Sequence, residues 1–318
     1  MRIRLLLLAG VAAATIAVLV VISRAFPSAA PGHRLAGPLP ARTAHYLGVY
    51  EKGEPGSYRP IGRFGQVAGS QVNLAGYFSG WPETFKPLFA RTALAHGAAT
   101  LVQMDPTDAS VAKIAAGDYD DYLRSYADAV RAFGHPVVIG FGHEMNATWY
   151  SWGYGHVPPR TFVAAWRHLV TVFRQQGADN VTWLWTIQAD IKGSGQVKQW
   201  WPGGRYVTWI GIDGYYYLRS DTFATVFGAT IAQVAAFRKP VLLSETAVGP
   251  LAGQPDKITD LFRGMAAYRT LGLVWFDITQ DQGVYHQDWR VEDSPAAERS
   301  FRAAARRYLA WRPEVTSQ

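Results

Sequence analysis

The stretch Val137-Val138-Ile139-Gly140-Phe141-Gly142-His143-Glu144 begins as a short apolar run and ends in an ionisable pair. Later in the chain, Val241-Leu242-Leu243 is followed in a similar way by Ser244-Glu245. Apolar runs of this length are typical of fully buried strands. Each run therefore delivers a carboxylate near the end of a strand, and carboxylates are suited to general acid and base chemistry.

Apolar runs of strand length alternate with segments of helical period along most of the chain. The eight expected strands span residues 46–50, 72–78, 99–104, 137–141, 181–187, 207–212, 240–244 and 273–277. Such alternation predicts a parallel sheet of the α/β class. Eight units in 318 residues match a closed (β/α)8 TIM barrel better than an open doubly wound sheet. In a barrel the carboxyl ends of all strands converge on one face, so Glu144 and Glu245 are expected to meet there.

Composition narrows the possible classes of protein. With 49% hydrophobic and 14% aromatic residues, the chain can bury a large single core. The absence of cysteine excludes disulfides, thiolate metal sites and a cysteine nucleophile. The formal charge of +7 comes from scattered Lys and Arg, so no nucleic-acid partner is expected.

A metal-dependent barrel hydrolase is a rival interpretation. The histidines that it would use show no ligand spacing, which disfavours a metal site, and we expect no metal and no cofactor. These histidines are His45, His96, His143 and His156.

The N-terminal segment predicts export. Arg2 and Arg4 precede an apolar stretch from Leu5 to Ile22, followed by small residues. The stretch exceeds the roughly 7 to 15 residues of an ordinary signal peptide and just reaches the length of a membrane span. Residues 1–30 are thus either a signal peptide or an N-terminal membrane anchor, 31–43 a linker, and 44–318 the catalytic domain. Both alternatives place the domain outside the cell, where we expect a monomer.

From Tyr46 to about Arg307 the chain resembles glycoside hydrolase family 26, a set of retaining endo-β-glycanases typified by β-mannanases. The order and spacing of several short motifs together are more specific than any one of them. These motifs are Tyr77-Phe78-Ser79-Gly80-Trp81, Ile114-Ala115-Ala116-Gly117-Asp118-Tyr119-Asp120, His143-Glu144-Met145-Asn146, Gly211-Ile212-Asp213-Gly214-Tyr215, Ser244-Glu245 and Asp288-Trp289-Arg290.

The resemblance implies roles for the two glutamates. Glu144 would be the acid/base and Glu245 the nucleophile, at the ends of strands four and seven as in the clan to which the family belongs. Their environments must push their pKa values apart, because one is needed protonated and the other ionised. A retaining mechanism requires the two carboxyl groups to lie roughly 5 to 5.5 Å apart. Tyr215, which matches the strand-six tyrosine of the family, is expected to hold Glu245 by a hydrogen bond, with a core tyrosine as the alternative.

Sugar contacts are expected from aromatic side chains near strand ends, since flat faces stack on sugar rings. Trp149 and Trp275 match the subsite tryptophans of the family. The full set of expected substrate-binding residues is His143, Trp149, Tyr215, Trp275, Trp152, Trp185, Asn146 and Trp81. For Asn146, a turn or helix cap is an equal alternative.

Departures from the family pattern bear on the substrate. Family mannanases commonly carry Arg-Pro before the His-Glu pair and Gly after Met-Asn, whereas Gly140-Phe141-Gly142 and Ala147 stand here. The usual Pro-Asn pair is also missing after Ile187. We expect a β-1,4-mannan-type polysaccharide first and a mixed-linkage β-1,3-1,4-glucan second. The non-enzymatic alternative is a surface polysaccharide-binding protein.

Overall fold

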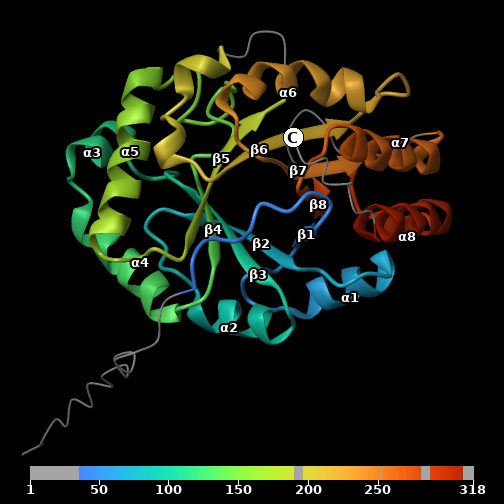
Figure 1. The fold of residues 1–318 in the computed structure, drawn as a ribbon, viewed down its shortest axis with the longest axis horizontal. Coiled ribbons are helices and arrows are strands. Elements are labelled where there is room, and N and C mark those ends of the chain that lie inside the picture. Colours follow the sequence, from blue (N-terminus) through green and yellow to red (C-terminus); the bar gives the residue numbers. More distant parts are fainter. Residues whose placement is uncertain (1–35, 190–195, 251, 281–286, 311–318) are drawn as a thin grey trace, which may run out of the picture. The chain divides into compact units, whose positions relative to one another are not determined.

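The computed structural model describes residues 36–189, 196–250, 252–280 and 287–310. Within these ranges eight parallel strands close into a barrel in the order β1 to β8, as the sequence predicts (Figure 1). The strands are β1 Tyr46–Glu51, β2 Leu74–Gly80, β3 Ala99–Asp105, β4 Val137–Phe141, β5 Val181–Gln188, β6 Trp209–Tyr216, β7 Val241–Val248 and β8 Gly272–Asp277. The pairing of β1 with β8 from Tyr46↔Gly272 to Glu51↔Asp277 closes the cylinder.

The expected signal or anchor lies outside the described residues, as does part of the expected linker. No helix in the described part of the chain has the length and apolar character that a membrane span requires.

Two strands differ from expectation near the candidate site. β6 begins at Trp209 and runs on to Tyr216, and β7 runs on to Val248, so Glu245 lies inside β7 rather than at its end. The register between β6 and β7 shifts between Gly211 and Asp213, and Glu245 is then paired with Asp213. Such bulges re-aim side chains and are frequent beside active sites. The polar pair Ser244-Glu245 interrupts the apolar run but not the strand.

Helices follow the strands and cover the outside of the barrel (Figure 1). They are α1 Arg59–Ala68, α2 Pro87–Ala95, α3 Val111–Ala116, α4 Asp120–Phe133, α5 Pro159–Gln175, α6 Ala229–Val234, α7 Gln254–Ala267 and α8 Pro295–Ala310. α5 begins at a proline, whose fixed φ suits the first turn of a helix. Before α6, residues Ala224–Gly228 form a π-helical turn instead of continuing one regular helix.

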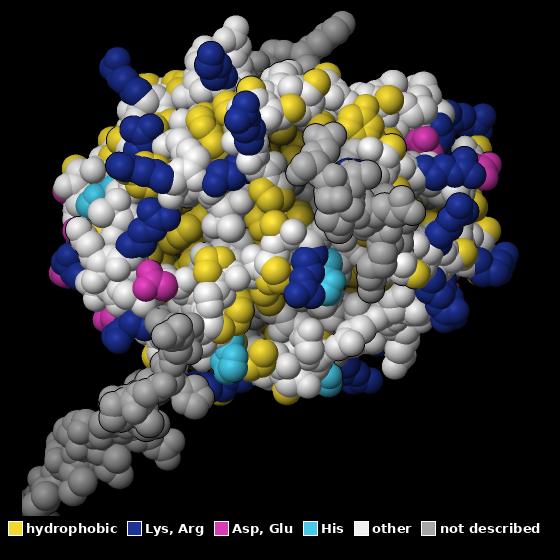
Figure 2. Space-filling model, viewed as in Figure 1, with side chains coloured by type: hydrophobic (Ala, Val, Ile, Leu, Met, Phe, Trp, Pro, Cys, Tyr) yellow, Lys and Arg dark blue, Asp and Glu magenta, His cyan; other side chains and the backbone are white. Residues whose placement is uncertain are grey.

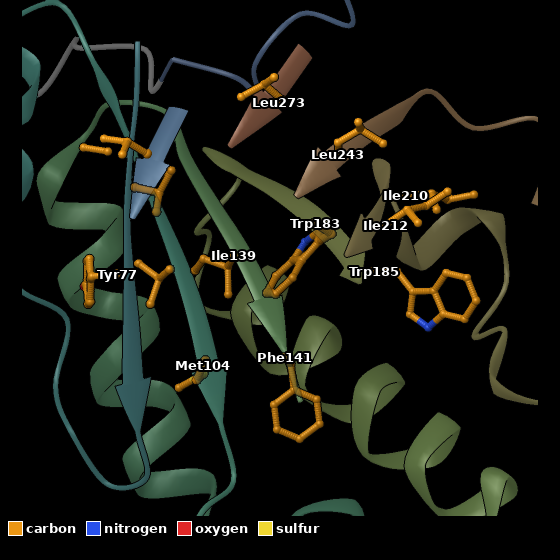
Figure 3. Close-up of a cluster of buried hydrophobic side chains, with 14 of the residues drawn as sticks. Tyr77, Met104, Ile139, Phe141, Trp183, Trp185, Ile210, Ile212, Leu243 and Leu273 are labelled. Atoms are coloured by element: carbon orange, nitrogen blue, oxygen red, sulfur yellow. The ribbon is translucent and has the colours of Figure 1, made fainter. Parts of the chain in front are cut away.

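The strands bury two cores because successive side chains point to opposite faces. The outer core lies between the barrel and the helices; Figure 3 shows part of it, including Phe141, Trp183 and Trp185. The inner core fills the barrel. Its members on the strands are Tyr46, Tyr50, Leu74, Leu101, Val138, Leu184, Trp209, Leu242 and Val274.

Toward the carboxyl ends of the strands the buried side chains become polar. Gln103 Nε2 donates a hydrogen bond to Thr186 Oγ1 at 3.2 Å, and Ser244 Oγ donates to Asp213 Oδ1 at 2.5 Å. Gly140 is required beside Gln103, since a Cβ there would lie 1.9 Å from Gln103 Oε1. This buried polar layer lies beneath the residues of the candidate site.

The surface agrees with the scattered charge of the sequence. Figure 2 shows Lys and Arg side chains at separate places over the visible face, with neutral polar and apolar surface between them.

Candidate active site

Glu144 and Glu245 are both buried, at 5% and 8% exposure, near the carboxyl ends of β4 and β7. Glu144 has a φ of 53°, a left-handed conformation that is uncommon outside glycine and gathers at functional sites. Its backbone N–H donates to the Thr186 carbonyl at 3.1 Å, which ties it to β5. The chain after β4 thus turns sharply to bring this carboxyl over the barrel.

The carboxyl of Glu144 accepts a hydrogen bond from Trp149 Nε1 at 2.7 Å. Burial raises the pKa of Glu144, the cation of His143 lowers it, and the charge of Glu245 raises it, with a result of about 7. A carboxyl with this pKa keeps a proton near neutral pH, as a general acid must. The charge of Glu245 is thus one of the influences on the pKa of Glu144, as expected for neighbouring carboxyls.

The carboxyl of Glu245 accepts a hydrogen bond from the hydroxyl of Tyr215, its neighbour on β6. Burial raises the pKa of Glu245, while the charge of His143 and the bond from Tyr215 lower it. A donor to a carboxylate stabilises the ionised form. Tyr215 itself packs against Trp289, with 4.7 Å between ring centroids. Its ring is therefore held by the buried Trp289.

His143 is buried, and each of its ring nitrogens has a partner. Nδ1 lies 2.8 Å from Asp105 Oδ1, and Nε2 lies 3.0 Å from the hydroxyl of Tyr150. Burial alone would lower the pKa of His143, but the charge and hydrogen bond of Asp105, with the charges of Glu144 and Glu245, raise it to about 10. Because both ring nitrogens have partners, the ring has little freedom to turn toward a sugar.

Only one of the five expected stacking tryptophans presents its face to solvent in this structure. Trp149 is 52% exposed, beside Glu144. A stacking platform needs an open face, so the structure does not favour that role for the other four, Trp81, Trp152, Trp185 and Trp275, which are buried. Their stacking on sugar stays a prediction without structural support.

The buried tryptophans have structural partners instead. Trp185 packs on Trp201 and Phe237 in the outer core, and the indole of Trp275 donates to the Trp289 carbonyl at 3.1 Å. Trp152 stacks on Tyr150 at 4.4 Å between centroids and donates to the His143 carbonyl. Trp81 packs against Tyr122. Sequence spacing located these residues near strand ends but could not tell which side of the sheet they face.

Asn146 is fully buried and bonded twice to the backbone of Gln188. Its Nδ2 donates to the Gln188 carbonyl at 2.9 Å, and its Oδ1 accepts the Gln188 N–H at 2.8 Å. These bonds fasten the β4–α5 loop to the end of β5. They match the structural alternative and leave the side chain no obvious group for a sugar hydroxyl.

Three polar residues at this end of the barrel were not predicted as site residues. Asp105 ends β3 and holds His143, Tyr150 bonds the other nitrogen of that ring, and Asp213 stands opposite Glu245. Burial, then the charges of Glu245 and Glu144, raises the pKa of Asp213 well above its usual range. Asp105 could have been found by the rule that identified Glu144, because it too follows an apolar run.

In the described ranges, no group of three or more His, Asp and Glu side chains is placed to hold a metal ion. The two carboxyls differ in their surroundings, because the pKa of Glu144 is near 7 and the carboxyl of Glu245 is bonded to a phenol. Such a pair can protonate a departing oxygen and attack the carbon that it leaves.

The chain is similar in sequence to several curated proteins. Endoglucanase H of Acetivibrio thermocellus is 27% identical over 275 residues, which cover 81% of this chain and 30% of that protein. The β-1,3-xylanase TXYA of a Vibrio species is 24% identical over 138 residues, 43% of this chain and 28% of that protein. The chain thus spans less than a third of the length of these curated relatives.

The structural comparison shows a shared fold. The catalytic domain of an endo-β-1,4-mannanase from Bacillus sp. JAMB-750 superposes with a TM-score of 0.63 at 14% identity, covering 83% of this chain and 86% of that one. The model of glycosyl hydrolase family 26 matches residues 100–303, which include both glutamates, His143, Trp149 and Tyr215. On this match the chain belongs to glycosyl hydrolase family 26.

Proposed function

We propose that this protein is a retaining endo-β-glycanase in which Glu144 is the acid/base and Glu245 the nucleophile. The observation that carries the proposal is the pair of buried, interacting carboxyls near the ends of β4 and β7, each with its own hydrogen-bond donor. A structural ion pair would need a basic partner for each carboxyl. Here two acids share one buried histidine.

In the first step Glu144 gives its proton to the glycosidic oxygen while the carboxylate of Glu245 bonds to the anomeric carbon. The bond between that carbon and the oxygen breaks, and the shortened chain leaves as an alcohol. In the second step Glu144 takes a proton from water, whose oxygen replaces Glu245 at the anomeric carbon. Two inversions give net retention, and both side chains return to their starting states.

The donors around each carboxyl suit these roles. The Tyr215 hydroxyl favours the anion of Glu245, which must attack before it can leave. The Trp149 indole keeps one oxygen of Glu144 oriented and presents an exposed face beside the reacting bond. A sugar ring stacked on that face would lie within reach of the acid.

We propose a β-1,4-mannan-type backbone as the first substrate and a mixed-linkage β-1,3-1,4-glucan as the second. Membership of the family and the fold shared with a β-1,4-mannanase support the first. The similarity to Endoglucanase H and the loss of the Arg-Pro pair before His143 support the second. We also propose that the enzyme acts outside the cell as a monomer, after export directed by residues 1–30.

Release of reducing ends from mannan, glucomannan, lichenan and xylan tests the substrate. We expect activity on the first two, or on lichenan if the alternative holds, and activity confined to xylan would contradict both. Glu245→Ala should abolish hydrolysis and leave polysaccharide binding intact, as measured by affinity electrophoresis. If the unsubstituted protein binds these polymers and hydrolyses none, it is a binding protein instead.

A further inference from the structure

His143 is held more firmly than a residue that only contacts substrate would require. Asp105 Oδ1 lies 2.8 Å from His143 Nδ1 and also accepts the backbone N–H of His143 at 3.4 Å. Tyr150 occupies the opposite ring nitrogen, and the His143 and Asp105 side chains are only 4% and 7% exposed. One carboxylate at the end of β3 thus fixes both the backbone and the ring of the residue next to Glu144.

We propose that Asp105 is a positioning residue that holds His143 as a permanent buried imidazolium beside Glu144 and Glu245, and that this fixed cation sets the pH range in which the pair works. The inference rests on the proposed function of the two glutamates and extends it to Asp105 at the end of β3.

Ionisable groups from four strand ends surround His143. They are Asp105 on β3, Glu144 and Tyr150 after β4, Asp213 on β6 and Glu245 on β7. The charge of His143 lowers the pKa of Glu144, of Glu245 and of Asp213, each of which burial raises. Without that cation the pKa of all three buried carboxyls would rise further, which disfavours the negative charge that the nucleophile needs.

The charge of His143 in turn depends on Asp105. Burial by itself favours the neutral ring, and the charge of Asp105 is the largest influence that opposes it. Asp105→Asn keeps an oxygen that can accept a hydrogen bond from His143 Nδ1 but removes the negative charge. We expect the ring to become neutral near pH 7 and the pKa of both glutamates to rise. The charge of His143 influences both pKa values more than the charge of Asp105 does, so its loss outweighs the removal of the Asp105 charge, which by itself raises them.

The test compares Asp105→Asn with the unsubstituted protein in two measurements. In the pH dependence of kcat/KM, both limbs should move to higher pH by about 1 unit or more. A purely structural role would lower activity and leave both limbs in place. In 15N NMR of the histidine rings, with His143 assigned by loss of its signal in His143→Gln, the ring should stay protonated at pH 8 in the parent and be neutral in Asp105→Asn.

The chain offers a matched control in a second aspartate–histidine pair. Asp120 Oδ1 lies 2.6 Å from His168 Nε2 between α4 and α5, where both side chains are 27% exposed. Asp120→Asn should change the signal of His168 and leave the limbs of the pH profile unmoved.

The inference is overturned if His143 is neutral in the parent at pH 7. It is also overturned if Asp105→Asn folds and both limbs of its kcat/KM profile lie at the same pH as in the parent. If Asp105→Asn does not fold, the NMR measurement on the parent still shows whether His143 is protonated. Because it needs no turnover, a protonated His143 in a protein without hydrolytic activity would refute the proposed function and leave the Asp105–His143 coupling standing.

Discussion

At the level of single residues, the pKa of each carboxyl depends on the side chains that surround it. Glu144 and Glu245 are chemically identical and equally buried, so only their neighbours can give them different tasks. A phenol bonds one and an indole the other, and both feel the same buried imidazolium. Changing a neighbour should therefore change the pH dependence of activity before it changes the fold.

Tyr215→Phe removes the hydroxyl that bonds Glu245 and should lower kcat/KM by about 10- to 100-fold, since a hydrogen bond to a charged group contributes about 1.5 to 3 kcal/mol. The bond lowers the pKa of Glu245, so its loss raises that pKa. The carboxylate then forms only at higher pH, and the acidic limb of the kcat/KM profile should shift upward.

Tyr216→Phe is the matched control for this change. The hydroxyl of Tyr216 points to Asp260 Oδ2 at 3.0 Å, away from the two glutamates. Loss of this hydroxyl should leave both limbs of the kcat/KM profile at the same pH. An equal shift in Tyr215→Phe and Tyr216→Phe would show that the Tyr215 hydrogen bond does not set the pKa of Glu245.

At the scale of elements, the alternation of apolar runs and helical stripes predicted the barrel and all eight strands. It also put Glu144 and Glu245 near the ends of β4 and β7. Pattern alone missed the bulge that sets Glu245 opposite Asp213, because an extra residue in a strand depends on the neighbouring strand. It also could not tell that Trp185 and Trp275 are buried, because the side of the sheet that a side chain faces depends on its place in the alternation of the strand.

Two tryptophans on neighbouring elements separate packing from binding. Trp185→Ala in β5 should destabilise the fold by about 3 to 5 kcal/mol, because it empties a site in the outer core. KM of the folded enzyme should be unchanged. Trp149→Ala in the β4–α5 loop should raise KM and lower kcat with a change in stability within about 0.5 kcal/mol.

Urea unfolding and steady-state kinetics on both variants check this contrast. Suppose instead that Trp185→Ala raises KM of the folded enzyme and leaves its free energy of unfolding nearly unchanged. The Trp185 indole would then contact the substrate, as the sequence predicts.

At the scale of the whole molecule, the seam where β1 meets β8 closes the barrel and holds a group of acids. Glu51 is paired with Asp277 across the seam, and Glu54 accepts the N–H of Glu51 at 2.8 Å. Burial first, then neighbouring acids, raises the pKa of Glu51 to about 7, of Glu54 to about 8 and of Asp277 to about 9. The folded chain therefore retains protons that the unfolded chain loses.

This difference predicts that stability falls as pH rises. The contribution of these acids is most favourable below their unfolded pKa values, near 4, and is lost progressively up to about pH 9. Asp277→Asn cannot ionise and can still accept the Val291 N–H, which Asp277 Oδ1 binds at 3.0 Å. Its stability relative to the parent should therefore improve from pH 5 to pH 8, by up to about 1.4 kcal/mol per pH unit.

Urea unfolding at pH 5, 7 and 8 measures this slope. Asp128→Asn is the control, because Asp128 lies half-exposed on α4 in a surface pair with Arg131. Equal slopes in the parent, Asp277→Asn and Asp128→Asn would show that the seam acids do not couple folding to pH.

Trapping the covalent intermediate tests most directly whether Glu245 is the nucleophile of a retaining mechanism. Incubation with an activated 2-deoxy-2-fluoro glycoside of the sugar that the enzyme hydrolyses slows the second step more than the first, so the glycosyl-enzyme accumulates. Peptide mass spectrometry should then find one sugar on the β7 peptide, attached to Glu245. A label on Asp213 or Asp105 would contradict the role of Glu245 as the nucleophile. An inverted product with no adduct would contradict the retaining mechanism.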